Sequence, residues 1–205
     1  MSQNKTNFAV PLAFVGMMFF AIGFALGINS FLIPVLKGAL SLPSGVAYLL
    51  LAATFVPFLI FGYPASATIA KIGYKRTMAL SFLIFAVAFI LFVLSAKLEN
   101  FILFLIASFV SGAANAYLQA SVNPYITILG PIESAAKRMS IMGICNKLAW
   151  PVAPLFFALV VADQTNVQTS DLYLPFYIII GVFLLLGIIS LMAPLPEVKA
   201  AGEDE

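Results

Sequence analysis

Long runs of apolar residues, separated by short polar or charged segments, fill most of this sequence. A membrane-spanning helix needs about 20 mostly apolar residues, and six stretches of the chain meet this requirement. They cover residues 8–36, 46–70, 77–96, 101–129, 135–161 and 173–195. The pattern therefore predicts an all-α membrane protein, with a bundle of six transmembrane helices over residues 1–196 and an acidic cytoplasmic tail over residues 197–205.

The composition agrees with this pattern and excludes several classes of protein. Hydrophobic residues make up 63% of the 205 residues and charged residues only 9%, whereas about a quarter of a soluble domain is charged. The net charge of +2 is too small to indicate a nucleic-acid partner. Histidine is absent and Cys145 is the single cysteine, which excludes His-dependent catalysis, a zinc site and an internal disulfide. We therefore expect no enzymatic activity, no metal and no cofactor.

Successive segments between the spans lie on alternate sides of the membrane. The basic residues are distributed unevenly between these two sets of segments. One set holds seven Lys and Arg residues, and the other holds only Lys37 and Lys97. Short loops rich in Lys and Arg stay in the cytoplasm, so we expect both termini to be cytoplasmic. We also expect the first span to be an uncleaved signal anchor, because no small-residue cleavage site follows it. The seven cations are Lys5, Lys71, Lys75, Arg76, Lys137, Arg138 and Lys199.

The first and fourth spans share a pattern of amide and proline residues. A shift of 90 residues places Asn29 on Gln119 and Pro34 on Pro124. The two spans cross the membrane in opposite directions, so the match indicates a three-plus-three inverted repeat, an arrangement found in many membrane transporters. The alternative is that both prolines are the ordinary kinks of membrane helices.

Polar side chains recur every four residues in the fourth span. Ser111, Asn115, Gln119 and Asn123 follow one face of this helix, beside a stripe of small residues that begins at Ser108. Small residues let a neighbouring helix approach closely, whereas carboxamides are unfavourable against lipid and should face protein or a water-filled cavity. Amides both donate and accept hydrogen bonds, as a hydroxyl-rich substrate requires. Hydrogen bonding between helices is the alternative role of each amide.

The fifth span places a cation within the apolar region. Lys147 lies nine residues beyond Arg138, which is about 13 Å along a helix and therefore near the middle of the membrane. No acidic side chain lies within a span to pair with it, so Lys147 is a candidate functional residue. The alternative is a water pocket, or a partner supplied from outside the six spans. Asn146 and Trp150 lie on one face of the same span, where the indole could stack on a sugar ring or simply pack.

Three segments of the chain carry a resemblance to a known family. They are residues 114–131 (ANAYLQASVNPYITILGP), residues 143–147 (GICNK) and residues 29–34 (NSFLIP). These segments resemble the fucose/glucose/galactose permease family, a group of sugar transporters in the major facilitator superfamily. The resemblance extends over essentially the whole chain. Since family members have twelve spans, it implies the N-terminal half of such a transporter, in a bacterial inner membrane.

The resemblance also implies roles for individual residues. Relatives that carry fucose with a proton use an Asp in the first span and a Glu in the fourth, and the matching positions here are Ser30 and Gln119. The coupling ion, H⁺ or Na⁺, therefore stays open, with Lys147 and Ser30 as the candidate coupling residues. The expected substrate-binding residues are Asn29, Asn115, Gln119, Asn123, Asn146 and Trp150.

One six-span bundle supplies only one wall of such a transport path. We therefore expect a second copy of this chain or a C-terminal-half bundle as the partner that allows alternating access. The family resemblance implies a hexose as the substrate. The alternatives are a membrane scaffold that does not transport and a truncated permease fragment. The sequence leaves the identity of the sugar open.

Overall fold

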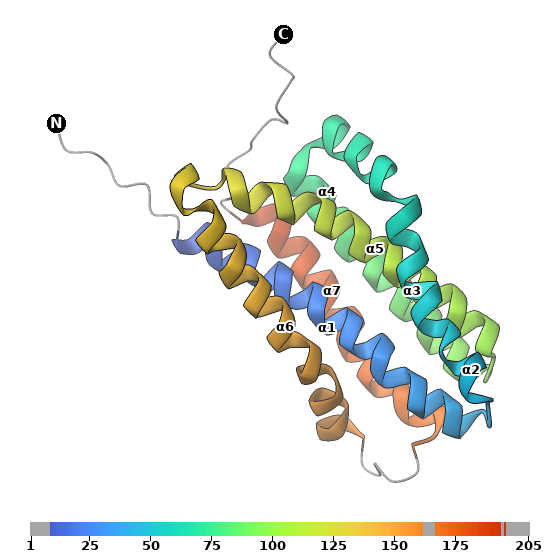
Figure 1. Ribbon diagram of the computed structural model, residues 1–205. Helices are drawn as coiled ribbons and strands as arrows, with labels where there is room; N and C mark the ends of the chain where they lie inside the picture. Colours follow the sequence, from blue (N-terminus) through green and yellow to red (C-terminus); the bar gives the residue numbers. More distant parts are fainter. Residues whose placement is uncertain (1–8, 162–166, 194, 196–205) are drawn as a thin grey trace, which may run out of the picture.

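The computed structural model describes residues 9–161, 167–193 and 195, and nearly all of these residues are helical (Figure 1). The predicted tail over residues 197–205 lies outside the described residues. The α-helices are α1 (Ala9–Ala39), α2 (Ser44–Ala47), α3 (Leu49–Ile60), α4 (Gly62–Lys97), α5 (Phe101–Ile128), α6 (Ala135–Val160) and α7 (Tyr173–Met192), and two short 3-10 helices are η1 (Ile132–Ser134) and η2 (Thr169–Leu172). Within the described residues, five helices are long and apolar enough to cross a membrane.

The second and third predicted spans differ from the prediction. The helix expected over residues 46–70 is interrupted at Tyr48 and Phe61, and α4 continues through the loop expected over residues 71–76. The chain turns within α4 at Gly73, whose φ of 81° and ψ of 169° are not helical. Glycine adopts a positive φ without the steric cost that other residues meet. The second crossing thus consists of α2, α3 and the first part of α4, and the rest of α4 is the third (Figure 1).

The packing of the helices agrees with the predicted inverted repeat. α1 packs against α6, and α5, its equivalent in the repeat, packs against α3. Both contacts depend on glycine: a Cβ at Gly23 would collide with the Asn146 carbonyl oxygen of α6, and one at Gly112 with the Thr54 carbonyl oxygen of α3. Close approach through small residues is the usual way in which membrane helices associate.

A cluster of stacked aromatic rings lies between α4 and α7. The rings of Phe85 and Phe183 stack with their centroids 4.7 Å apart, and those of Phe92 and Phe176 with 5.4 Å. Such pairs contribute about 0.5–1.5 kcal/mol beyond the area that they bury. This cluster fixes α7 to α4, while α1, α3, α5 and α6 surround the polar side chains described next.

The outer surface of the bundle is apolar. Large hydrophobic side chains are exposed along all the long helices, among them Leu59, Leu159 and Met192. An apolar surface this extensive would be unfavourable in water but matches the hydrocarbon of a bilayer. The chain is therefore a multi-pass membrane protein.

Candidate functional site

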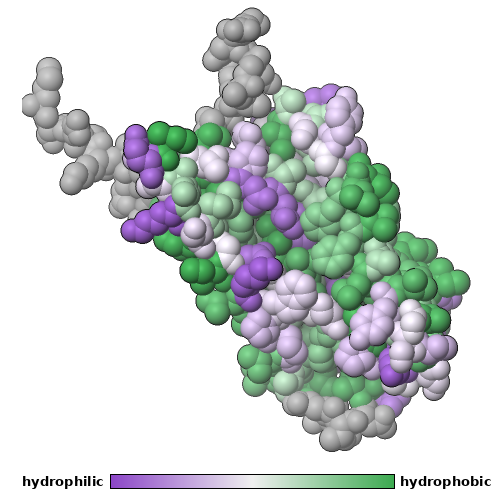
Figure 2. All heavy atoms as spheres, viewed as in Figure 1, coloured by the Kyte–Doolittle hydropathy of each residue, from purple (hydrophilic) through white to green (hydrophobic). Residues whose placement is uncertain are grey.

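A polar pocket with a volume of about 540 Å³ lies between α1, α3, α5 and α6. Figure 2 views this side of the molecule, where hydrophilic residues run along the middle of the face beside hydrophobic ones. α1 and α3 contribute only apolar residues to the lining, and α5 and α6 contribute the polar side chains. Five of the residues singled out from the sequence meet here: Gln119, Asn123, Asn146, Lys147 and Trp150.

The polar stripe of α5 reaches the pocket only at its C-terminal end. A step of four residues turns a helix by about 40° beyond a full turn, so the stripe rotates around α5 as it advances. Ser111 and Asn115 are therefore fully buried inside the bundle, whereas Gln119 and Asn123 line the pocket. The side chains of Gln119 and Asn123 have no hydrogen-bond partner among the residues that the structure describes, which leaves their donors and acceptors for a ligand.

Asn29 and Asn115, both expected to bind substrate, are not brought to the pocket. Asn29 is fully buried and its Nδ2 donates to the Ala25 carbonyl oxygen at 3.0 Å and to Ser111 Oγ at 3.4 Å. Its Oδ1 and both amide atoms of Asn115 lack a partner within the described residues. An unpaired buried amide costs about 1–3 kcal/mol, so we expect an ordered water at this contact between α1 and α5.

Ser30, one of the two coupling candidates, also lies away from the pocket lining. Its Oγ donates to the Leu26 carbonyl oxygen at 3.1 Å, one turn earlier in α1. This bond within the helix satisfies the hydroxyl hydrogen locally. The position at which the family resemblance implies an acid therefore holds a hydroxyl that is hydrogen-bonded within its own helix.

Asn146 is fixed by contacts between α6 and α1. Its Nδ2 donates to the Phe19 carbonyl oxygen at 3.1 Å, and its own carbonyl oxygen lies against Gly23. One turn further, the Trp150 carbonyl oxygen lies against Gly27 in the same way. The glycine pair of α1 thus sets the positions of Asn146 and Trp150, and the Asn146 Oδ1 remains as an acceptor for a ligand.

Lys147 is exposed at the pocket, with its Nζ 5.8 Å from the centroid of the Trp150 ring. This arrangement is a cation–π contact, which typically contributes about 0.5–1 kcal/mol at an exposed site. The acidic residues that the structure describes are Glu99, Glu133 and Asp171, and all three lie outside the long helices. Lys147 is therefore the single charged side chain that lines the pocket within the described part of the chain.

Arg138 has a structural role beyond its contribution to the charge bias of the flanking segments. Arg138 is 7% exposed and donates to the carbonyl oxygens of Ile126, Thr127 and Pro131 at 3.1, 3.0 and 2.8 Å, and to Ser134 Oγ. The last carbonyl groups of a helix lack partners within that helix, so the guanidinium holds the end of α5. A basic residue shortly after a predicted helix end was the available signal.

The apolar wall of the pocket was also missed. Phe19, Ile22 and Leu26 of α1 and two phenylalanines of α3 complete the lining. The two rings of α3, Phe55 and Phe58, lie with their centroids 5.9 Å apart. Twenty phenylalanines in the chain gave no reason to select these. A pocket with amides on one side and aromatic rings on the other can hydrogen-bond a polar ring while covering its apolar face.

The sequence and the fold both match known proteins. Residues 14–205 match the sequence profile of the Major Facilitator Superfamily. The chain is 31% identical to a glucose/galactose transporter of Brucella abortus biovar 1 (strain 9-941), over 100% of this chain and 50% of that relative. It is 23% identical to the L-fucose-proton symporter of Escherichia coli (strain K12), over 98% of this chain and 51% of that relative.

A solved structure shows the same helix arrangement. The crystal structure of FucP, a Major Facilitator Superfamily transporter in the outward conformation, superposes with a TM-score of 0.80 at 22% identity, over 97% of this chain and 53% of that chain. The chain thus spans about half the length of the relatives it matches. These matches confirm the fold predicted from the sequence. The chain belongs to the Major Facilitator Superfamily and has the six-helix fold of one half of its transporters.

Proposed function

We propose that this chain is half of a sugar transporter and that its polar pocket forms one wall of the path of a hexose. The observation that carries the proposal is the convergence of Gln119, Asn123, Asn146 and Trp150 on one pocket. The names of the relatives, a glucose/galactose transporter and an L-fucose-proton symporter, point to the same class of substrate.

The chemistry of the lining fits a monosaccharide. Gln119 and Asn123 each offer an amide that donates and accepts, and a sugar hydroxyl does both. The indole of Trp150 and the rings of α3 offer apolar surface for the C–H face of the sugar. Each hydrogen bond to a hydroxyl typically contributes about 0.5–1.5 kcal/mol, so binding needs several of them together.

A second six-helix bundle is part of the proposal. The described lining of the pocket comes from four helices of one bundle, whereas alternating access requires two bundles that rock about a shared site. The second bundle is either another copy of this chain or a complementary half. We place the assembly in a bacterial inner membrane, with both termini in the cytoplasm, on the basis of the seven-to-two excess of cations in one set of flanking segments.

Coupling to an ion is assigned to Lys147 in this proposal. Proton symport is part of the name of one relative, but the carboxylates that the family resemblance implies are replaced here by Ser30 and Gln119. Neither a hydroxyl nor an amide exchanges a proton near neutral pH. Lys147 is the one ionisable side chain in the described lining of the pocket, so the proposal assigns coupling to it.

Titration of the intrinsic fluorescence tests the proposal, because Trp150 is the only tryptophan of the chain. The chain, reconstituted with a tryptophan-free complementary bundle, is titrated with D-glucose, D-galactose and L-fucose, with sucrose as a control. We expect a saturable change with at least one hexose and none with sucrose. A well-folded assembly whose Trp150 responds to no hexose would indicate a membrane scaffold instead.

A further inference from the structure

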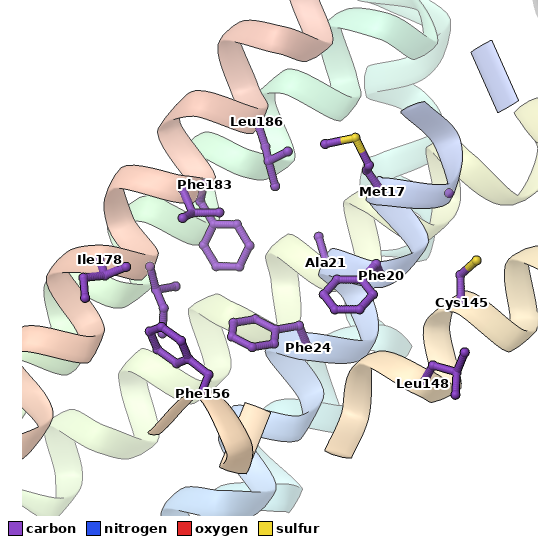
Figure 3. A pocket seen from close by; sticks show the side chains of 13 residues that line it. Met17, Phe20, Ala21, Phe24, Cys145, Leu148, Phe156, Ile178, Phe183 and Leu186 are labelled. Atoms are coloured by element: carbon purple, nitrogen blue, oxygen red, sulfur yellow. The ribbon is translucent and has the colours of Figure 1, made fainter. Parts of the chain in front are cut away.

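A second pocket, with a volume of about 560 Å³, lies between α1, α6 and α7 and is lined by apolar residues and Cys145 (Figure 3). Met17, Phe20 and Phe24 project into it from α1, and Phe183 and Leu186 face them from α7 (Figure 3). No polar side chain other than the thiol lines it. We call this space the α1–α7 groove.

The α1–α7 groove lies at the height of the membrane interior. Its α7 residues run from Ile178 to Leu186, the middle of a helix that spans Tyr173–Met192. A helix of this length crosses the hydrocarbon region of a bilayer, so the groove is far from both head-group layers. Val182 and Leu148, which line it, are 47% and 61% exposed. The groove therefore opens sideways, toward the hydrocarbon.

The groove is separate from the polar pocket. α7 contributes no residue to the polar pocket, and α3 and α5 contribute none to the groove. α1 and α6 form a wall between the two: Phe20 and Phe24 line the groove, whereas Phe19 and Ile22 line the pocket. A second bundle docked over the polar pocket would leave the groove in contact with lipid.

The inverted repeat shows that the groove occupies the place of a helix contact. α5, the fourth crossing, packs against α4, and within the third crossing Phe92 of α4 lies against Phe104 of α5 with ring centroids 6.1 Å apart. The equivalent pair in the repeat is α7 and α1. α7 and α1 scarcely touch, and α6 makes few contacts with α7. The described part of the chain therefore leaves an apolar groove between α1 and α7 that it does not fill.

The chemistry of the lining selects the occupant. Water needs two to four polar partners in a buried site, and a sugar needs more, but the groove offers only a weak thiol donor. An apolar cavity of about 150 Å³ binds benzene, and a groove of about 560 Å³ accepts a much longer hydrocarbon. Lipid acyl chains are the hydrocarbon present at this depth.

We propose that the α1–α7 groove binds one acyl chain of a membrane phospholipid. The acyl chain takes the place of the missing contact between α1 and α7. It also packs against the groove side of the wall that α1 and α6 form. This binding site does not depend on which solute the polar pocket carries. It predicts a phospholipid that stays with the protein after extraction from the membrane.

Filling the groove with protein tests the proposal. Val182→Trp puts an indole into the groove from an exposed position on α7, and Val87→Trp is a matched control on α4, since Val87 is 46% exposed and lies outside the groove. The full chain is purified in detergent, supplied with dioleoyl phosphatidylethanolamine and examined by native mass spectrometry. We expect one retained phospholipid on the unmodified chain and on Val87→Trp, and roughly tenfold less retention on Val182→Trp. Equal retention by the two variants, or none by the unmodified chain, overturns the proposal.

A second copy of the chain is the competing occupant. Cys145 lines the groove and is the only cysteine. A short bis-maleimide therefore cross-links two copies of the chain only if their grooves face each other. In liposomes at low protein density we expect monomers after cross-linking. Efficient Cys145–Cys145 dimers would show that protein, not lipid, covers the groove, and would overturn the proposal.

Discussion

At the scale of single residues, the position of each amide around its helix decides whether it lines the polar pocket. Gln119, Asn123, Asn146 and Trp150 meet in one pocket as the polar pattern suggested. Asn115 has the same residue type and spacing, yet it is buried. The difference arises because a four-residue repeat drifts around a helix, and the neighbours of each turn are not visible in a sequence.

Gln119→Ala tests the role of α5 in sugar binding. The change removes an amide from the pocket lining, and losing one well-placed hydrogen-bonding group typically costs about 1–3 kcal/mol. We expect hexose affinity of the reconstituted assembly to fall roughly tenfold or more, measured by Trp150 fluorescence. Ser66→Ala is the control, because Ser66 is exposed on α4 and bonds only to the Gly62 carbonyl oxygen. An unchanged affinity in a folded Gln119→Ala assembly would contradict the site assignment.

Lys147→Gln and Lys147→Met test the proposed coupling role. Neither replacement can carry a proton, and each side chain is only one atom shorter than that of lysine. We expect both variants to lose pH-driven sugar accumulation in liposomes but to keep downhill exchange. Lys137→Gln, an exposed cation at the start of the same helix, should keep both activities. Equal loss of accumulation and exchange would assign Lys147 to substrate contact or to structure instead.

Arg138→Ala tests the guanidinium that holds the end of α5. The residue donates to three carbonyl oxygens and one hydroxyl, so its loss should destabilise the bundle by about 2–4 kcal/mol. Lys137→Ala, at the exposed neighbouring position, should change stability by less than about 0.5 kcal/mol. Thermal unfolding in detergent, followed by circular dichroism, measures both. Similar midpoints for the two variants would show that the Arg138 hydrogen bonds contribute little.

At the scale of helices, hydrophobic length predicted the crossings well because a bilayer demands long apolar helices. Hydrophobic length did not predict where the second crossing ends and the third begins. Three cations at Lys71, Lys75 and Arg76 suggested a loop, but charge alone does not end a helix, and the chain turns at Gly73 alone. The breaks at Tyr48 and Phe61 lie inside an apolar run, so hydrophobic length did not reveal them, although Gly62 and Pro64 follow the second break.

Gly23→Ala tests the close contact between α1 and α6. A Cβ there meets the Asn146 carbonyl oxygen, so the helices must separate, and overpacking of this kind costs about 1–3 kcal/mol. Gly181→Ala is the matched control, because a Cβ at Gly181 of α7 has nothing within 4 Å. That change should be neutral or stabilise by up to about 1 kcal/mol. Equal unfolding midpoints for the two variants would rule out a tight α1–α6 contact.

At the scale of the whole molecule, the described lining of the polar pocket belongs to a single six-helix bundle. Polar groups on an open face are unfavourable against lipid, and the chain spans about half the length of its relatives. Pattern and resemblance in the sequence already implied one bundle of a two-bundle transporter. They did not reveal the α1–α7 groove, because that space results from a helix contact that the fold leaves out.

The measurement that tests this account most directly is hexose flux through the reconstituted chain, with and without a second bundle. Liposomes at a low protein-to-lipid ratio hold single copies, and a parallel set holds either crowded copies or the chain with a complementary six-helix half. The account predicts no saturable flux from single copies, and saturable hexose-specific flux only when a second bundle is present. Saturable, hexose-specific flux from single copies would contradict it.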